Sequence, residues 1–121
     1  MKQVLAILAA ALLAVPAAAQ LVPPPSELSL EHRMLLRCSA AFALVAYRQG
    51  AGDAEAAQYP PLKERGGEFF VRASARVMEE AGLDRAAVSA ALEGEAKALL
   101  EGGTLAAVMP VCLSLLDASE R

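Results

Sequence analysis

The sequence is poor in the side chains that build sheets and metal sites. Its 121 residues include no tryptophan, one histidine and two cysteines, and aromatic residues make up 4% of the chain. Aromatic side chains favour strands, whereas the alanine and leucine that dominate here favour helices. A typical metal site needs more histidine and cysteine ligands than this chain supplies. We therefore expect an all-α protein with no metal site.

Signatures of catalysis are also missing. The chain has no GxSxG motif, and its only histidine, His32, has no evident triad partner, so we expect a solvated surface residue there. The glycine pairs at 66–67 and 102–103 lack the spacing and the lysine of a phosphate loop. Glu95 lies near the apolar side of a predicted helix, where we expect it to pair with an arginine or to snorkel to water. We expect no enzyme activity, no catalytic residue and no cofactor.

The charge balance excludes another class of function. The formal net charge is −3, from 11 basic and 14 acidic residues. A nucleic-acid-binding protein, or one that binds anionic lipid, would carry a basic patch instead. We therefore expect no nucleic-acid partner.

The first nineteen residues are typical of a secretory leader. Lys2 is the positive n-region, residues 4–15 form an apolar core, and the alanines at 17–19 offer a small-residue cleavage site. The apolar run is short for a bilayer span, which favours cleavage over a retained anchor. We expect a mature chain that begins at Gln20, has no membrane span and is periplasmic or secreted.

The two cysteines of an exported chain most simply form one disulfide. Cys38 and Cys112 each lie on an apolar face of a predicted helix. A bridge between them would stabilise the fold by on the order of 4 kcal/mol in the chain-entropy account. Two buried free thiols or half of a metal site are the competing interpretations. His32 lies about 120° from Cys38 around the helix, which disfavours the metal.

Apolar periodicity predicts four helices in a single domain at residues 29–121, after an extended, proline-rich lead-in at residues 20–28. Asp84 would cap the third helix and Thr104 the fourth. Pro110 lies inside the fourth helix and should kink it or break it into two short pieces. The expected fold is a small all-α bundle or array of four helices, stapled by one disulfide.

The second predicted helix carries a distinct set of signals. Pro60 and Pro61 are tolerated in the first turn of a helix, and Gly82 is a suitable terminator, so we expect the helix to run between them. Its inner face would include both Phe69 and Phe70.

The first predicted helix, residues 30–49, is apolar on nearly all sides, which is typical of a helix wrapped by its neighbours. Cys38 marks one face. We interpret the opposite face as a candidate interaction surface, which is either covered by other helices of the monomer or paired with a second copy in a symmetric dimer. The residues of this face are Leu36, Ala40, Ala43, Leu44 and Tyr47.

The string RGGEFF at residues 65–70 is the most distinctive in the chain. Arg65 and Arg72 are candidate anion contacts beside its aromatic residues. The alternative, which we favour, is that the phenylalanines belong to the core and the arginines pair with Glu64 and Glu68 on the same helix.

The strings RGGEFFVRASARVM and VMPVCLSLLDA resemble a group of small exported helical proteins of alphaproteobacteria that have no assigned function. The resemblance covers residues 37–118, includes both cysteines, and implies no activity, cofactor or site. At the level of class alone, the chain also resembles the HdeA-type periplasmic chaperones, which are small, helical and stapled by one disulfide. Their cysteines lie closer together in sequence, so this second likeness is an analogy.

We interpret the chain as a non-enzymatic exported helical domain that acts as a protein-interaction module in the periplasm. Its partner would be another protein or a second copy of the same chain. The alternative is a periplasmic chaperone or carrier for hydrophobic ligands, which would need an internal cavity.

Overall fold

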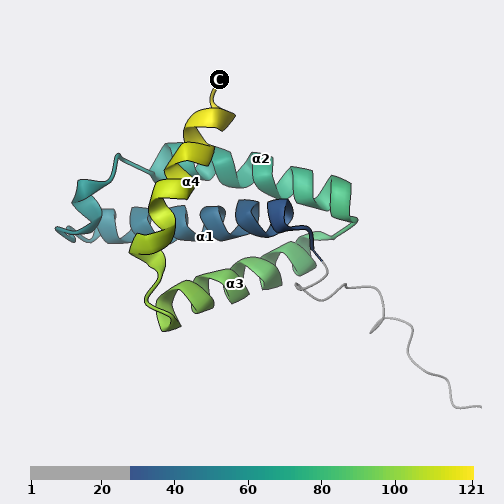
Figure 1. Ribbon diagram of the computed structural model, residues 1–121, viewed down its shortest axis with the longest axis horizontal. Helices are drawn as coiled ribbons and strands as arrows, with labels where there is room; N and C mark the ends of the chain where they lie inside the picture. The colour runs from purple at the N-terminus through teal and green to yellow at the C-terminus, as the bar shows by residue number, and fades with distance from the viewer. Residues whose placement is uncertain (1–27) are drawn as a thin grey trace, which may run out of the picture.

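The computed structural model describes residues 28–121, which form four α-helices and one short 3₁₀ helix (Figure 1). Residues 1–27, with the predicted leader and nearly all of the predicted lead-in, lie outside the described residues. No strand occurs in the described part, which confirms the prediction of a small all-α bundle. The elements are α1 (Leu30–Gly50), η3 (Ala56–Gln58), α2 (Lys63–Ala81), α3 (Arg85–Glu101) and α4 (Leu105–Ser119).

Helix α1 is the centre of the bundle, as its apolar pattern predicts. It contacts α2, α3, α4 and η3. Figure 1 shows α2 and α3 on opposite sides of α1, with α4 crossing it. The helix begins after Ser29, whose hydroxyl accepts a hydrogen bond from the amide of His32 at 3.0 Å. Within it, Phe42 and Val45 are almost completely buried.

A disulfide between Cys38 and Cys112 joins α1 to α4, and both residues are fully buried. Their Cα atoms are 5.2 Å apart, which is usual for a disulfide. Around the bond, the side chains of Met109 and Leu116 are also excluded from solvent. The predicted pairing is therefore confirmed, and it lies within the main apolar core.

The start of α2 differs from the prediction. The helix begins at Lys63, after both prolines, because the side chain of Gln49 holds the preceding segment outside the helix. The side-chain amide nitrogen of Gln49 donates to the carbonyl oxygens of Ala56 at 3.1 Å and Pro60 at 3.0 Å. Its amide oxygen accepts from the backbone nitrogen of Leu62 at 3.1 Å. A long-range contact thus replaces the expected proline-led first turn.

The packing of α2 on α1 requires a glycine. A Cβ atom added to Gly66 would lie 2.9 Å from the Cβ of Phe42, well inside an ordinary carbon–carbon contact of about 3.5–4.0 Å. Phe69 packs edge-on against Phe42, with ring centroids 5.2 Å apart. The expectation that Phe70 shares this inner face is wrong. Adjacent residues of a helix point about 100° apart, and Phe70 is 41% exposed.

Most of the remaining helix ends lie where the sequence predicts them. Asp84 caps α3 through a hydrogen bond from the amide of Ala87 at 2.8 Å. Gly82 ends α2 with a left-handed backbone. Thr104 occupies the N-cap position of α4, but its side chain makes no capping bond. Helix α4 runs unbroken through Pro110, so the alternative of two short pieces is wrong. Pro110 has no backbone N–H to donate to the carbonyl of Ala106, and both residues are exposed to water, which can bind that carbonyl instead.

A second, smaller core lies between α1, α2 and α3. It forms around Leu36 and Val77, both almost fully buried, and it includes Leu28 just before α1. Leu83 and Val88, which flank the start of α3, are buried in the same cluster. No helix within residues 28–121 is long and apolar enough to cross a bilayer.

Candidate functional site: apolar grooves between the helices

The predicted interaction face of α1 is divided by the fold. Leu36 is 1% exposed and Ala40 is also buried, because α2 and α3 cover this part of α1. Leu44 is partly buried, whereas Ala43 is exposed and Tyr47 is 78% exposed. The alternative that the monomer covers this face therefore holds for Leu36 and Ala40 but not for Tyr47, so the five residues do not form one interaction surface. Neighbouring helices bury the amino-terminal half, and only the end near Tyr47 remains accessible.

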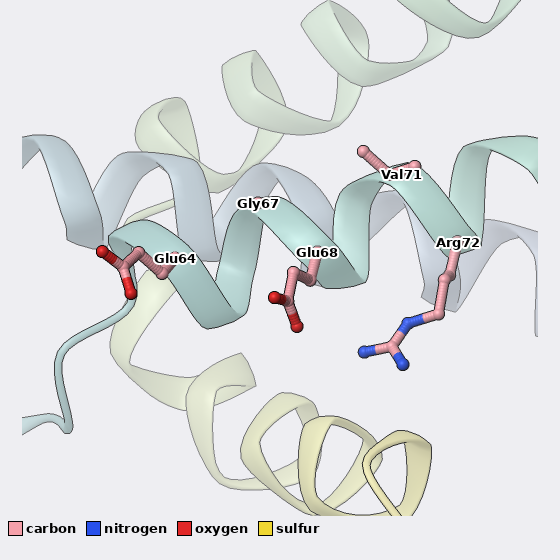
Figure 2. Close-up of a pocket in the computed structure, with 5 residues that line it drawn as sticks. All are labelled: Glu64, Gly67, Glu68, Val71 and Arg72. Carbon is pink, nitrogen blue, oxygen red and sulfur yellow. The ribbon is translucent and has the colours of Figure 1, made fainter.

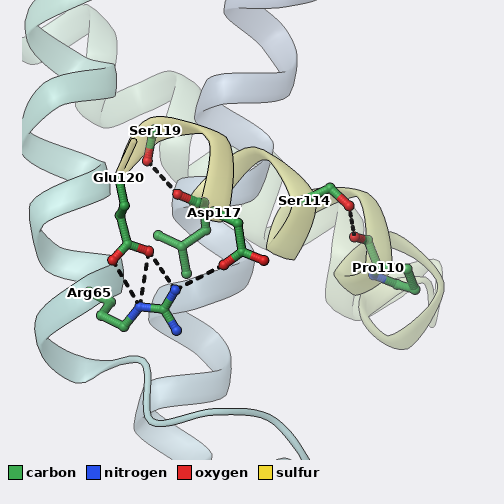
Figure 3. Close-up of polar contacts among 7 residues, drawn as sticks. Arg65, Pro110, Ser114, Asp117, Ser119 and Glu120 are labelled. Carbon is green, nitrogen blue, oxygen red and sulfur yellow. Dashed lines mark hydrogen bonds and ion pairs between the residues drawn. The ribbon is translucent and has the colours of Figure 1, made fainter.

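The two predicted anion contacts have different surroundings. Arg65 donates to Asp117 at 3.0 Å and to both carboxylate oxygens of Glu120, as Figure 3 shows. These hydrogen bonds hold the pKa of the Glu120 carboxyl below its ordinary value. Both acids come from the end of α4, so the predicted pairing of Arg65 within α2 is wrong. With two carboxylates on its guanidinium, Arg65 is not available to an anion.

Arg72 makes no ion pair with any residue of the described part, so its predicted partner on α2 is also wrong. It borders a shallow hollow of about 600 Å³ on the surface of α2, with Glu64, Gly67, Glu68 and Val71. Figure 2 shows the two glutamates and Arg72 on the same side of the helix. Two carboxylates and one guanidinium give this hollow no net attraction for an anion.

His32 is not the solvated residue that its position suggests. Its side chain is largely buried, and its Nε2 lies 3.0 Å from a carboxylate oxygen of Glu80. The other oxygen of Glu80 accepts from Arg76 at 2.6 Å, and Arg76 also reaches Glu31 at 2.6 Å. The hydrogen bond with His32, followed by that with Arg76, keeps the pKa of Glu80 below its ordinary value. This cluster ties the start of α1 to the end of α2.

Glu95 lies elsewhere, and it pairs with an arginine as expected. A carboxylate oxygen of Glu95 is 2.9 Å from the Nε of Arg37, so the pair connects α3 to α1. The chain therefore does not assemble His32 and Glu95 into one site. Among the described residues, no group of three histidine, cysteine or acidic side chains is placed to hold a metal ion.

A large apolar depression lies between α1, α2 and α4, and we call it the α1–α4 groove. Its volume is about 700 Å³. Leu30 is 75% exposed and Val111 is 46% exposed, although both are large aliphatic residues. Glu31 and Arg76 of the ionic cluster border it. The apolar residues that line the groove are Leu30, Met34, Leu35, Phe69, Val111, Leu115 and Ala118.

Two smaller grooves flank α2 elsewhere. One, of about 290 Å³, lies between α1 and α2 and includes Ala43 of the predicted interaction face. The other, of about 330 Å³, lies between α2 and α3, and Phe70 borders both. Sequence reasoning missed all three grooves, because a groove depends on how far apart two helices diverge. Val111 was the one hint in the sequence of an apolar residue facing solvent. It is adjacent to Cys112, and adjacent residues of a helix point about 100° apart, so the two cannot both face the core.

No protein-family model, curated protein or solved structure matches the chain. The arguments about function therefore depend on the geometry described above.

Proposed function

We propose that the protein is a non-enzymatic, exported interaction module whose α1–α4 groove binds an amphipathic helix of a partner protein in the periplasm. The observation that carries this proposal is the exposure of Leu30 and Val111 beside an otherwise apolar groove. A leucine or valine that passes from water into an apolar contact contributes about 1.5–3 kcal/mol. Both residues can be buried only by something that enters the groove.

The shape of the groove favours a polypeptide. It is an open depression whose walls come from three helices, α1, α2 and α4. A helix laid into such a groove presents apolar side chains at i, i+3 or i+4, and i+7. The runner-up, a carrier that encloses a hydrophobic ligand completely, would need a closed cavity, and the α1–α4 groove is open to solvent.

The charges at the border of the groove favour a partner helix that carries basic residues. Arg76 is paired with both Glu31 and Glu80, so this border carries two carboxylates for one guanidinium. The chain as a whole also has a net charge of −3. A partner helix with lysine or arginine beside its apolar stripe complements this border.

Export supports the same assignment. The predicted leader at residues 1–19 directs the chain to an oxidising compartment, where the bond between Cys38 and Cys112 is stable. A cytoplasmic role would expose this bond to reducing conditions.

Site-specific photocross-linking in the exporting cell tests the proposal. Benzoylphenylalanine at position 111 is expected to yield an adduct with another polypeptide, and mass spectrometry should place the adduct in a segment with aliphatic residues at helical spacing. Leu100 is the matched control position, because it is a large exposed aliphatic residue on α3 outside the groove.

Two results would contradict the proposal. The same adducts from positions 111 and 100 would show non-specific contact. An adduct between two copies of this chain would assign the groove to self-association instead.

A further inference from the structure

The groove between α2 and α3 contains a polar group that the fold leaves without a partner. Ser74 is 6% exposed, and its hydroxyl oxygen is buried with no hydrogen-bond partner. A buried polar group left unpaired costs about 1–3 kcal/mol. Other serines inside helices avoid this cost, since Ser39 donates to the carbonyl of Leu35 at 2.8 Å and Ser114 to that of Pro110 at 3.2 Å. Ser74 is therefore the exception among these three.

The polar end of the groove is formed by α3. Arg85, the first residue of that helix, lines the groove and makes no ion pair with any described residue. Ser89 lies one turn further along the same wall and adds a second hydroxyl. An anion near Arg85 would thus meet a guanidinium and a hydroxyl from α3, and the hydroxyl of Ser74 from α2.

The rest of the groove is apolar. Met78 lies on the last turn of α2, near the connection to α3, and Val88 lies on the first turn of α3. Phe70, Val71 and Leu92 lie further from that connection and form the apolar end of the groove. Phe70 and Val71 are large and exposed. The groove therefore changes along its length from cationic and hydroxylic to apolar.

We propose that the α2–α3 groove binds a medium-chain carboxylate amphiphile, with its carboxylate on Arg85, Ser74 and Ser89 and its acyl chain along Phe70 and Leu92. One arginine matches one carboxylate, whose two oxygens accept from the planar guanidinium and from hydroxyl donors. The volume of about 330 Å³ is at the lower end of the range of about 300–1,000 Å³ found for small-molecule sites, which favours a medium chain. Arg85 and Leu92 are also only about 10 Å apart along the axis of a helix.

This site is independent of the α1–α4 groove. The two grooves share no lining residue, so one can bind its ligand when the other does not. Failure of the proposed protein interaction would therefore leave this inference standing, and the reverse is also true.

Titration of the full disulfide-bonded protein with decanoate, below its micelle concentration, tests the inference by calorimetry and by NMR chemical-shift mapping. We expect saturable binding, with shifts at Phe70, Ser74 and Leu92 rather than at Val111. Arg85→Gln should weaken binding about tenfold or more, because it removes a charged hydrogen-bond donor. Arg72→Gln is the matched control, since Arg72 is exposed and unpaired in the described part but lies outside this groove.

Ser74→Ala separates a ligand contact from a structural role. We expect weaker decanoate binding, about fivefold or more, together with a folded stability equal to or above that of the original chain, because the unpaired hydroxyl is gone. Decanol, which lacks the carboxylate, should bind more weakly than decanoate. The inference is overturned if decanoate does not bind, if its shifts map to the α1–α4 groove, or if Arg72→Gln weakens binding as much as Arg85→Gln.

Discussion

Two neighbouring glycines of α2 allow a sharp test of how closely α1 and α2 pack. Gly66 faces Phe42, whereas Gly67 is exposed, and a Cβ added there would meet nothing within 4 Å. Both lie in the first half of the same helix. Replacement by alanine removes the same backbone entropy from the unfolded chain at both positions, which alone would stabilise the helix by about 0.5–1 kcal/mol.

The two variants should therefore differ by the cost of the new contact at Gly66. The added Cβ would lie 2.9 Å from the Cβ of Phe42, an atom that is fixed by the backbone of α1 and cannot rotate away. The helices would have to move apart by several tenths of an ångström. Overpacking of this kind costs about 1–3 kcal/mol. We expect Gly67→Ala to be more stable than the original chain, and Gly66→Ala to be less stable than Gly67→Ala by about 1–3 kcal/mol.

Urea unfolding followed by far-UV circular dichroism measures this difference. With an unchanged denaturant slope, the shift in midpoint reports the free energy of unfolding. Equal stabilisation by the two substitutions would refute the close approach of the helices at Gly66. An altered slope in Gly66→Ala alone would indicate a change in compactness, and the comparison would then be repeated by calorimetry.

Three further predictions concern the cores and the ionic contacts. Substitution of both Cys38 and Cys112 by alanine removes the disulfide. Because the two cysteines are 74 residues apart, this should lower the free energy of unfolding by about 4.5 kcal/mol. A reductant should then have no further effect on the urea midpoint of the double variant. Leu36→Glu should unfold the monomer, as seen by size-exclusion chromatography and circular dichroism, because this residue is buried within one chain; a folded variant would contradict that placement. The pKa values of Glu80 and Glu120 are lowered in the folded state, so the stability they contribute is present above about pH 4.3 and is lost as the pH falls through their folded values. Urea midpoints measured from about pH 6 to pH 3 should decline in that window, and a flat profile would contradict the two clusters.

The features predicted from the sequence are those with a local or compositional cause. The end of α2 at Gly82 and the cap of α3 at Asp84 follow from backbone geometry and one side chain each. The disulfide follows because a chain with only Cys38 and Cys112 has one possible intramolecular pairing. These inferences needed no knowledge of how the helices cross.

The features that sequence reasoning missed depend on long-range placement. The i, i+4 rule favours a partner for Arg65 on its own helix, yet the fold brings the end of α4 next to it and supplies Glu120. In the same way, Gln49 fixes the start of α2 from the end of α1. Leu36 and Tyr47 belong to one apolar stripe in the sequence, but neighbouring helices bury only Leu36.

The α1–α4 groove also depends on the order in which the chain is synthesised. Its walls include Leu30 from the first helix of the domain and Val111 from the last, so no fragment that stops before Leu105 contains both sides. During synthesis, Leu30 is added to the chain long before Val111. A partner of this groove, as proposed above, would therefore bind only after α4 has been added to the chain. The bond between Cys38 and Cys112 would then link the two helices, α1 and α4, that carry Leu30 and Val111.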